Sequence, residues 1–187
     1  MRGTVERPQG WRYLPDALPA ADERELLAHL LDLDYGEVRL HGQVARRVVR
    51  HFGMDYDFES ARVTAGEPVP AWLQGARAFA GDLLGRAPDE LAEVLVTRYP
   101  PGATIGWHRD APAFGDVVGV SLAAPCEMRF QHGSGADRRV FQQELVPRSA
   151  YVLSGRARTA WQHSIPAVAQ ERFSLTFRTL RRGRPAH

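Results

Sequence analysis

Two stretches in the first half of the chain carry apolar residues at helical spacing. In residues 19–33, pairs of leucines recur one helical turn apart, behind acidic residues suited to a helix N-terminus. The second stretch follows Pro70, and its apolar residues repeat three and four positions apart until Gly85 and Pro88 end the pattern. The pattern therefore predicts two amphipathic helices.

From about residue 93 the apolar period changes from 3.6 to 2 residues, as in strands. Many short strands without helices between them favour an antiparallel sandwich or jelly roll over a parallel sheet. We expect an α+β fold that is mainly β: a double-stranded β-helix (jelly roll) with the N-terminal helices packed on one face. The predicted strands are Glu93 to Tyr99, Val117 to Ala123, Glu127 to Phe130, Arg139 to Val146, Ser149 to Leu153, and Arg172 to Leu180.

Length and composition predict one globular domain over residues 1–187, because no repeat or low-complexity linker interrupts the chain. The hydrophobic fraction is 44% and the charged fraction 25%, and no apolar run approaches the roughly 18 residues that a membrane span needs. The polar segment Met1–Gly10 lacks a secretory signal, and Cys126 has no partner for a disulfide. We therefore expect a cytoplasmic protein without a membrane span, and we exclude a site built on several thiolates.

The basic charge is carried by arginine alone, because all 24 basic residues are Arg. A GC-rich coding bias explains this, but so does phosphate or carboxylate binding, since a guanidinium makes bidentate contacts with both groups. The formal charge of +2 permits a nucleic-acid partner without requiring one. Two groups of arginines stand out, and either could be a solvated face: Arg39, Arg46, Arg47 and Arg50, and Arg178, Arg181, Arg182 and Arg184.

The segment after the first predicted strand carries a candidate metal site. In an extended segment His108 and Asp110 project to the same side, so both can bind one ion. His163 can face them if the sheet curls into a barrel. Two imidazoles and one carboxylate form a facial triad that leaves positions open on Fe(II) for a bidentate oxoacid and O2. A His-x-Asp motif also occurs by chance, and a zinc hydrolase could use the same residues.

The last predicted strand places Arg172 and Arg178 on one face, together with two hydroxyl groups. Their Cα atoms should lie about 20 Å apart, a gap that two long side chains could narrow to the length of a five-carbon diacid. Each end of 2-oxoglutarate could then meet an arginine, whereas a zinc hydrolase has no use for the pair. The alternative interpretation is the basic outer face of an edge strand that binds nothing.

The order of these motifs resembles the AlkB family of nucleic-acid oxidative demethylases. A weaker similarity to the substrate lid of many bacterial members lies in Arg46 to Phe58. The resemblance implies N-terminal helices and a lid in about 1–90 and a jelly-roll catalytic core in about 91–182. It is carried by Thr97-Arg98-Tyr99, Pro101-Gly102, His108-x-Asp110, the Val117 to Leu122 strand, His163, and Arg172 to Arg178.

The resemblance also implies roles for single residues. The implied Fe(II) ligands are His108, Asp110 and His163. The implied contacts to 2-oxoglutarate are Tyr99, Arg172, Arg178, Thr97 and Ser174. Thr97 and Ser174 replace asparagines of the best-known bacterial members and keep a shorter hydrogen-bonding group.

Substrate contacts are implied by the lid and by the segment around the metal motif. Pro112 stands where the same bacterial members carry an aspartate that reads the damaged base, and Met54 stands where relatives often carry a stacking tryptophan. The choice of lesion therefore does not carry over. The candidate substrate residues are Arg46, Arg47, Arg50, Phe52, Tyr56 and Trp107.

The activity that the resemblance implies uses Fe(II), with 2-oxoglutarate and O2 as cosubstrates. 2-Oxoglutarate is decarboxylated to succinate and CO2, while an N-alkyl carbon on a DNA or RNA base is oxidised and released as formaldehyde. We expect a monomer without an obligate protein partner. Two alternatives stay open: a 2-oxoglutarate-dependent hydroxylase or demethylase of a protein or small molecule, and a non-catalytic nucleic-acid binding module.

Overall fold

The computed structural model describes residues 6–40, 42–57 and 62–181, without the side chains of residues 40, 55–57, 62 and 63. No helix in these ranges is long and apolar enough to cross a membrane. The elements in chain order are β1 (Trp11–Leu14), α1 (Ala20–Leu31), β2 (Gly36–Leu40), β3 (Gln43–Asp57), β4 (Arg62–Ala65), α2 (Ala71–Leu84), η1 (Pro88–Glu90), β5 (Leu91–Tyr99), β6 (Ile105–His108), β7 (Phe114–Leu122), β8 (Cys126–His132), η2 (Gly135–Asp137), β9 (Arg139–Leu145), β10 (Ser149–Leu153), α3 (Gly155–Thr159), β11 (Gln162–Ile165) and β12 (Arg172–Leu180).

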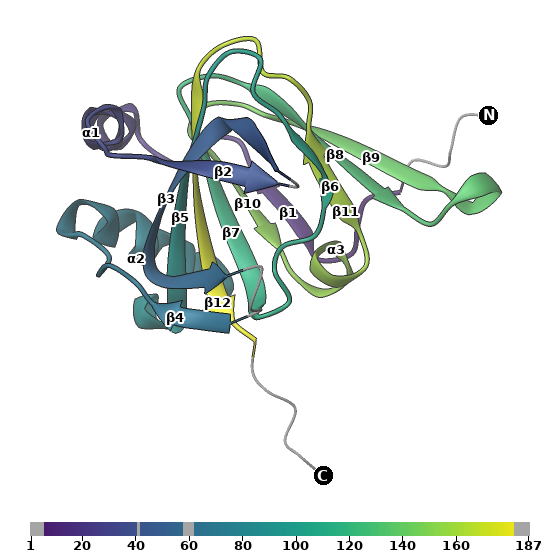
Figure 1. Cartoon of the computed structure of the whole chain (residues 1–187). Coiled ribbons are helices and arrows are strands. Elements are labelled where there is room, and N and C mark those ends of the chain that lie inside the picture. The colour runs from purple at the N-terminus through teal and green to yellow at the C-terminus, as the bar shows by residue number, and fades with distance from the viewer. Residues whose placement is uncertain (1–5, 41, 58–61, 182–187) are drawn as a thin grey trace.

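Two antiparallel sheets face each other, and α1 and α2 cover the outer face of the larger one (Figure 1). The larger sheet has the order β1-β10-β7-β12-β5-β3-β2, with β4 paired to β3. The smaller sheet has the order β6-β11-β8-β9. This is the predicted jelly roll with helices on one face.

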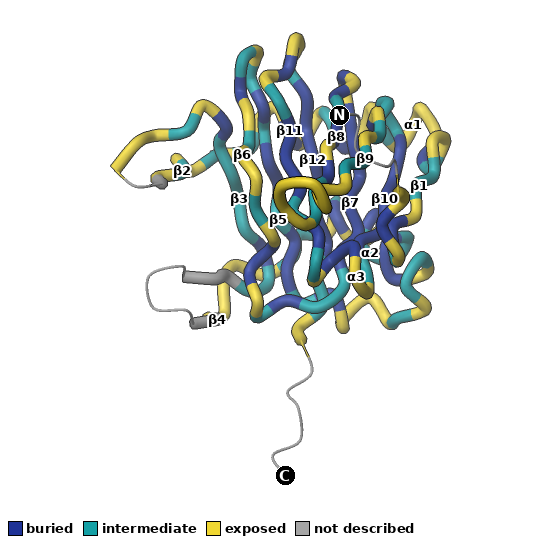
Figure 2. Tube along the Cα trace, turned by 90° about the vertical axis from the view of Figure 1, so that its right-hand side faces the viewer, coloured by how far each residue is buried: buried dark blue, intermediate teal, exposed yellow. Residues whose placement is uncertain are grey.

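The two faces of the larger sheet carry two separate apolar clusters, and burial is deepest along its central strands (Figure 2). On β12, Phe173 and Phe177 pack with the helices, while Arg172 and Ser174 turn inward between the sheets and are also buried. Because β12 lies between β7 and β5, the interpretation of its arginines as the outer face of an edge strand is wrong.

The first 90 residues are less helical than the pattern predicts. Both helices are confirmed, and α2 ends at Gly85 in the left-handed conformation. However, β1 to β4 also lie in this region. The 15-residue β3 pairs with β5 over Val48–Gly53, so much of the segment expected to form a lid is a strand of the larger sheet. Arg46 and Arg47 are adjacent, and so are Val48 and Val49, so the sequence of β3 shows no period of 2 there.

Gly119 on β7 is required because it lies directly opposite Tyr151 on β10. A Cβ atom at Gly119 would come within 2.1 Å of Cζ in the buried Tyr151 ring. Gly119→Ala is therefore expected to lower the free energy of unfolding by about 1–3 kcal/mol, the usual cost of overpacking, as measured by urea denaturation.

The matched control is Gly75→Ala on the exposed face of α2, where a Cβ atom meets nothing within 4 Å. This change is expected to be stabilising by about 0.5–1 kcal/mol, because alanine loses less backbone entropy in a helix. Equal stabilities of the Gly119→Ala variant and the wild type would show that Tyr151 does not need this space.

Candidate active site

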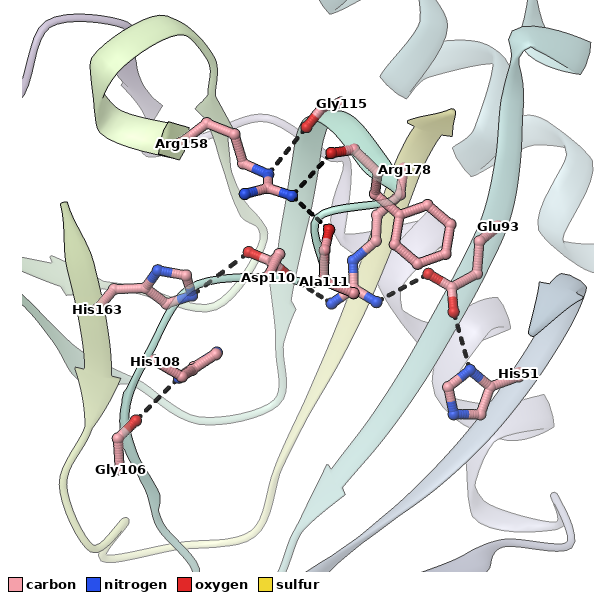
Figure 3. Close-up of polar contacts among 11 residues, drawn as sticks. His51, Glu93, Gly106, His108, Asp110, Ala111, Gly115, Arg158, His163 and Arg178 are labelled. Atoms are coloured by element: carbon pink, nitrogen blue, oxygen red, sulfur yellow. Dashed lines mark hydrogen bonds and ion pairs between the residues drawn. The ribbon is translucent and has the colours of Figure 1, made fainter. Parts of the chain in front are cut away.

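Strands β6 and β11 bring the two predicted histidine ligands together. His108 lies directly opposite His163 in the antiparallel pair, with ring centroids 4.2 Å apart. Asp110 follows two residues after His108, just beyond the end of β6, and its Oδ2 lies 3.6 Å from His163 Nε2 (Figure 3). The three side chains thus meet at one place between the sheets, as the sequence predicts.

The protonation states of these groups suit metal binding. Burial, reinforced by the neighbouring His108, lowers the pKa of His163 to about 3, so its imidazole is neutral. Burial lowers the pKa of His108 as well. Burial alone would raise the pKa of Asp110, but Arg178 and the two imidazoles outweigh it and hold that pKa well below its usual value. The site therefore offers one carboxylate and two neutral imidazoles near pH 7.

The donor atoms fit a divalent metal ion. Asp110 Oδ2 is buried and has no hydrogen-bond partner in the described part of the chain. His108 Nδ1 lies 2.8 Å from the carbonyl oxygen of Gly106, so Nδ1–H donates there and Nε2 keeps its lone pair. Two imidazole nitrogens and one carboxylate oxygen are the donor set of a non-haem Fe(II) site.

Arg178 lies beside the candidate metal ligands, and its guanidinium contacts carboxylates of the protein. Its Nη2 donates to Asp110 Oδ1 at 2.5 Å, and its Nη1 donates to Glu93 Oε2 at 2.8 Å. These contacts go to two carboxylates of the protein itself, and the role of Arg178 at one end of 2-oxoglutarate stays a prediction. The physical reason for the contact with Glu93 is cross-strand register, because Glu93 on β5 stands directly opposite Arg178 on β12.

Arg172, by contrast, is a buried cation without a counter-ion among its described contacts. It is 1% exposed, and its Nη2 donates to Ser121 Oγ at 3.1 Å. Its Nε and Nη1 have no partner in the described structure, and its Cζ lies 4.7 Å from the ring centroid of Tyr99. An unpaired buried guanidinium is costly unless an anion joins it. Arg172 is therefore the strongest candidate anion contact.

The other predicted cosubstrate residues lie around Arg172. Tyr99 stands opposite Arg172 on the neighbouring strand, and Thr97 stands opposite Ser174. All three neighbours are nearly buried, and burial raises the pKa of Tyr99, so its hydroxyl stays protonated and can donate a hydrogen bond. The sheet register therefore places three hydroxyl groups on the same inner face as the guanidinium.

A cavity of about 460 Å³ connects the candidate ligands with this inner face. Its size suits a small organic cosubstrate together with one group of a substrate. It is lined by Val38, Arg39, Arg47, Val49, His51, Glu93, Leu95, Thr97, Tyr99, Ile105, Gly106, Trp107, His108, Arg109, Asp110, Ala111, Phe114, Val117, Met128, Tyr151, His163, Ile165, Ser174, Thr176 and Arg178.

The predicted substrate residues divide between the two faces of β3. Arg47 lines the cavity, and so does Trp107 from β6, which is 41% exposed. Phe52 is wrong as a substrate contact, because it is buried in the core beneath the helices. Arg50 pairs with Glu67 outside the cavity.

Of the two remaining substrate candidates, one does not line the cavity, and the side chain of the other is not among those that the structure describes. Arg46 is exposed and reaches over the turn at Gly102 instead of lining the cavity. The side chain of Tyr56 lies outside those that the structure describes. The alternation of side chains along β3 explains the first case, since Arg46 and Arg47 must face opposite ways.

Two further residues, Glu93 and Arg158, belong to the site but were not predicted. Glu93 is fully buried in the cavity wall, and its Oε1 lies 2.9 Å from His51 Nδ1. The signal that could have identified Glu93 is its place at an inward-facing position of an otherwise apolar strand. Arg158 fixes the loop that follows Asp110, and nothing local in the sequence indicates this role. Its guanidinium donates hydrogen bonds to the carbonyl oxygens of Gly115, Ala111 and Phe114.

A jelly roll with a His-x-Asp…His set and a buried arginine on its last strand defines the class of non-haem iron oxygenases. The family model described as the 2OG-Fe(II) oxygenase superfamily matches residues 10–178. The chain therefore belongs to the 2-oxoglutarate- and Fe(II)-dependent oxygenase superfamily. Membership of this superfamily implies Fe(II) as the cofactor and 2-oxoglutarate and O2 as cosubstrates.

Curated relatives confirm the resemblance to the AlkB family. The Arabidopsis thaliana alkylated DNA repair protein ALKBH8 homolog is 31% identical over 182 residues, covering 84% of this chain and 51% of that protein. The Mus musculus tRNA (carboxymethyluridine(34)-5-O)-methyltransferase ALKBH8 is 28% identical over 172 residues, covering 87% of this chain and 25% of that protein. The chain thus spans about a quarter to a half of the length of these relatives.

Solved structures share the fold. The structure of OsALKBH1 has a TM-score of 0.67 and 17% identity, covering 94% of this chain and 99% of that chain. A 2OG-Fe(II) oxygenase family oxidoreductase from Burkholderia pseudomallei has a TM-score of 0.61 and 20% identity, covering 92% of this chain and 86% of that chain. These similarities confirm the predicted jelly roll.

Proposed function

We propose that the protein oxidises an alkyl group on a base of DNA or RNA. The observation that carries this proposal is the cavity that joins His108, Asp110 and His163 to the inner face of β12, with Arg47 and the exposed Trp107 also in its lining. A substrate group entering past Trp107 would reach the candidate metal ligands, with the cosubstrate site deeper between the sheets. The names of the mouse and Arabidopsis relatives, which refer to tRNA and to alkylated DNA, support a nucleic-acid substrate.

The residues divide into those that hold the cofactor and those that hold the cosubstrate. His108, Asp110 and His163 would bind Fe(II), which supplies the oxidising chemistry together with 2-oxoglutarate and O2. Arg172 would pair with the distal carboxylate of 2-oxoglutarate, and the hydroxyl of Tyr99 would donate to the same group. Because both side chains are buried, 2-oxoglutarate would be shielded from water at that end.

The substrate face of the cavity favours a base with a phosphate nearby. Trp107 presents an exposed ring on which a flipped base can stack, a contact worth about 1–3 kcal/mol per base. Arg39 and Arg47 line the same cavity and can pair with phosphate oxygens. Pro112 does not line the cavity, so the base-reading contact of the bacterial members has no counterpart there.

The proposal is tested by a formaldehyde-release screen on methylated DNA and RNA oligonucleotides, single- and double-stranded, with Fe(II), 2-oxoglutarate and ascorbate. Formaldehyde is expected from at least one methylated oligonucleotide, in equal amount to succinate, and none from the unmethylated sequence. Substrate-independent succinate production with no formaldehyde from any oligonucleotide would contradict a demethylase of nucleic acids. A protein or small-molecule substrate would then be favoured.

Arg47 provides a more local test of the substrate side. Arg47 is buried, and its one described hydrogen bond goes to the carbonyl oxygen of Thr104 at 3.3 Å. Arg47→Gln is expected to raise the KM for the oligonucleotide by about tenfold, because one charged hydrogen bond contributes about 1.5–3 kcal/mol. The KM for 2-oxoglutarate should change much less. Both constants come from initial rates of succinate formation.

Arg50→Gln is the matched control, since Arg50 lies on the same strand but pairs with Glu67 outside the cavity. It should leave both KM values close to those of the wild type. If Arg47→Gln instead raised the KM for 2-oxoglutarate and left that for the oligonucleotide unchanged, Arg47 would belong to the cosubstrate site.

A further inference from the structure

Glu93 sits at the centre of a polar chain that runs from the cavity wall to a candidate metal ligand (Figure 3). Its Oε1 contacts His51 Nδ1 at 2.9 Å, and its Oε2 accepts a hydrogen bond from Arg178 Nη1 at 2.8 Å. The other Nη of Arg178 reaches Asp110 Oδ1 at 2.5 Å. Two carboxylates therefore share one guanidinium, and both are buried.

The geometry of this chain follows from the strands. Glu93 and Arg178 are direct cross-strand partners on β5 and β12, and His51 on β3 lies diagonally across from Glu93. Contacts on both carboxylate oxygens hold Glu93 in one orientation. The guanidinium is in turn fixed so that it binds only Oδ1 of Asp110, and Oδ2 stays without a partner in the described structure. That oxygen also faces His163.

The charge of Glu93 matters as much as its shape. With Glu93 ionised, the group of Glu93, Arg178 and Asp110 carries a net negative charge, which attracts a divalent cation. Without that charge, Arg178 would neutralise Asp110 alone and compete with the metal for the same carboxylate. Coulomb interactions at such short range are strong where water is excluded. Glu93 has no contact of its own with His108 or His163 among the described residues.

We propose that Glu93 is a positioning residue that keeps Asp110 available to the metal ion by sharing the charge of Arg178. The inference rests on the proposed metal site, and it adds a determinant of metal affinity outside the ligand set. Substitutions of residues that orient metal ligands typically cost about 10–100-fold in affinity. Because Glu93 acts through one intervening residue, about tenfold is expected for loss of its charge.

The test is a calorimetric titration of the metal-free protein with Mn(II), an air-stable probe for Fe(II), without 2-oxoglutarate. Glu93→Gln keeps the size of the side chain and removes its charge, whereas Glu93→Asp keeps the charge and shortens the side chain. Glu93→Gln is expected to weaken Mn(II) binding about tenfold, while Glu93→Asp should stay within about threefold of the wild type. Melting temperatures of the metal-free proteins report the packing effect separately.

The two variants distinguish charge from packing. A packing role predicts the reverse order, with the shortened aspartate binding Mn(II) more weakly than glutamine, and that result would overturn the proposal. Equal affinities of Glu93→Gln and the wild type would overturn it too. If Glu93→Gln did not fold, Glu93→Asp would still test the proposal, since Mn(II) binding much weaker than in the wild type would contradict a charge role.

If the proposed metal site itself is wrong, the Mn(II) titrations give a different result. A wild-type protein that does not bind Mn(II), or an Asp110→Ala variant that binds it as well as the wild type, would contradict the proposed metal site and the role of Glu93 with it. Normal wild-type binding that is lost in Asp110→Ala but unchanged in Glu93→Gln would remove only the inference about Glu93.

Discussion

Asp110→Ala is expected to abolish both metal binding and turnover. The substitution removes the one carboxylate of the two-imidazole, one-carboxylate set and with it the only anionic donor of the candidate ligands. It also removes the buried oxygen that lacks a partner in the described structure and faces His163. The loss is measured by titration with Mn(II) and by succinate formation at saturating 2-oxoglutarate.

Asp116→Ala is the matched control for this prediction. Asp116 lies six residues further along and does not line the cavity that holds the candidate ligands. It should bind Mn(II) and turn over like the wild type. Retained iron-dependent turnover in the Asp110→Ala variant would remove Asp110, and with it the proposed triad, from the mechanism.

Arg172→Met is expected to have the second-largest effect, on the cosubstrate. Loss of one partner from a buried, hydrogen-bonded charge pair costs about 2–5 kcal/mol, which predicts an increase of at least about 30-fold in the KM for 2-oxoglutarate. The metal-free protein, in contrast, should be as stable as the wild type or more stable. Arg172 is 1% exposed and without a counter-ion among its described contacts, and an apolar side chain of similar length avoids the cost of burying a charge.

These opposite effects make the prediction specific to an anion-binding role. Initial rates give the KM, and thermal melting with and without 2-oxoglutarate gives the stability and the stabilisation by the ligand. If Arg172→Met destabilised the metal-free protein by several kcal/mol and left the KM unchanged, Arg172 would be a structural residue. The carboxylate contact would then have to be sought elsewhere.

The sequence predicts the strands well where the pattern of apolar residues is regular. β5, β10 and β12 follow regular runs of apolar residues, and the predicted strands agree with the observed ones closely. The spacing of His108 and Asp110 required only that the segment be extended, which holds up to the end of β6. The position of His163 depended on the curl of the whole sheet, and the cross-strand pairing of β6 with β11 supplies it.

Other features depended on contacts between distant strands. The charge network of Arg178 follows from its register with Glu93, 85 residues earlier in the chain, and a single sequence does not define that register. The sequence also does not show which residues of β3 face the cavity, because arginines occur on both faces of this strand. The resemblance to the substrate lid places Phe52 at the substrate, whereas its side chain packs in the core.

A crystal structure of the protein with Mn(II) and 2-oxoglutarate bound is the most direct test of the proposed metal and cosubstrate sites. The expected result is a metal ion bonded to His108, Asp110 and His163, with the distal carboxylate of 2-oxoglutarate on Arg172 and Arg178 still bridging Asp110 and Glu93. A metal ion bound elsewhere, or a distal carboxylate held by Arg178 with Arg172 unoccupied, would contradict the proposed sites.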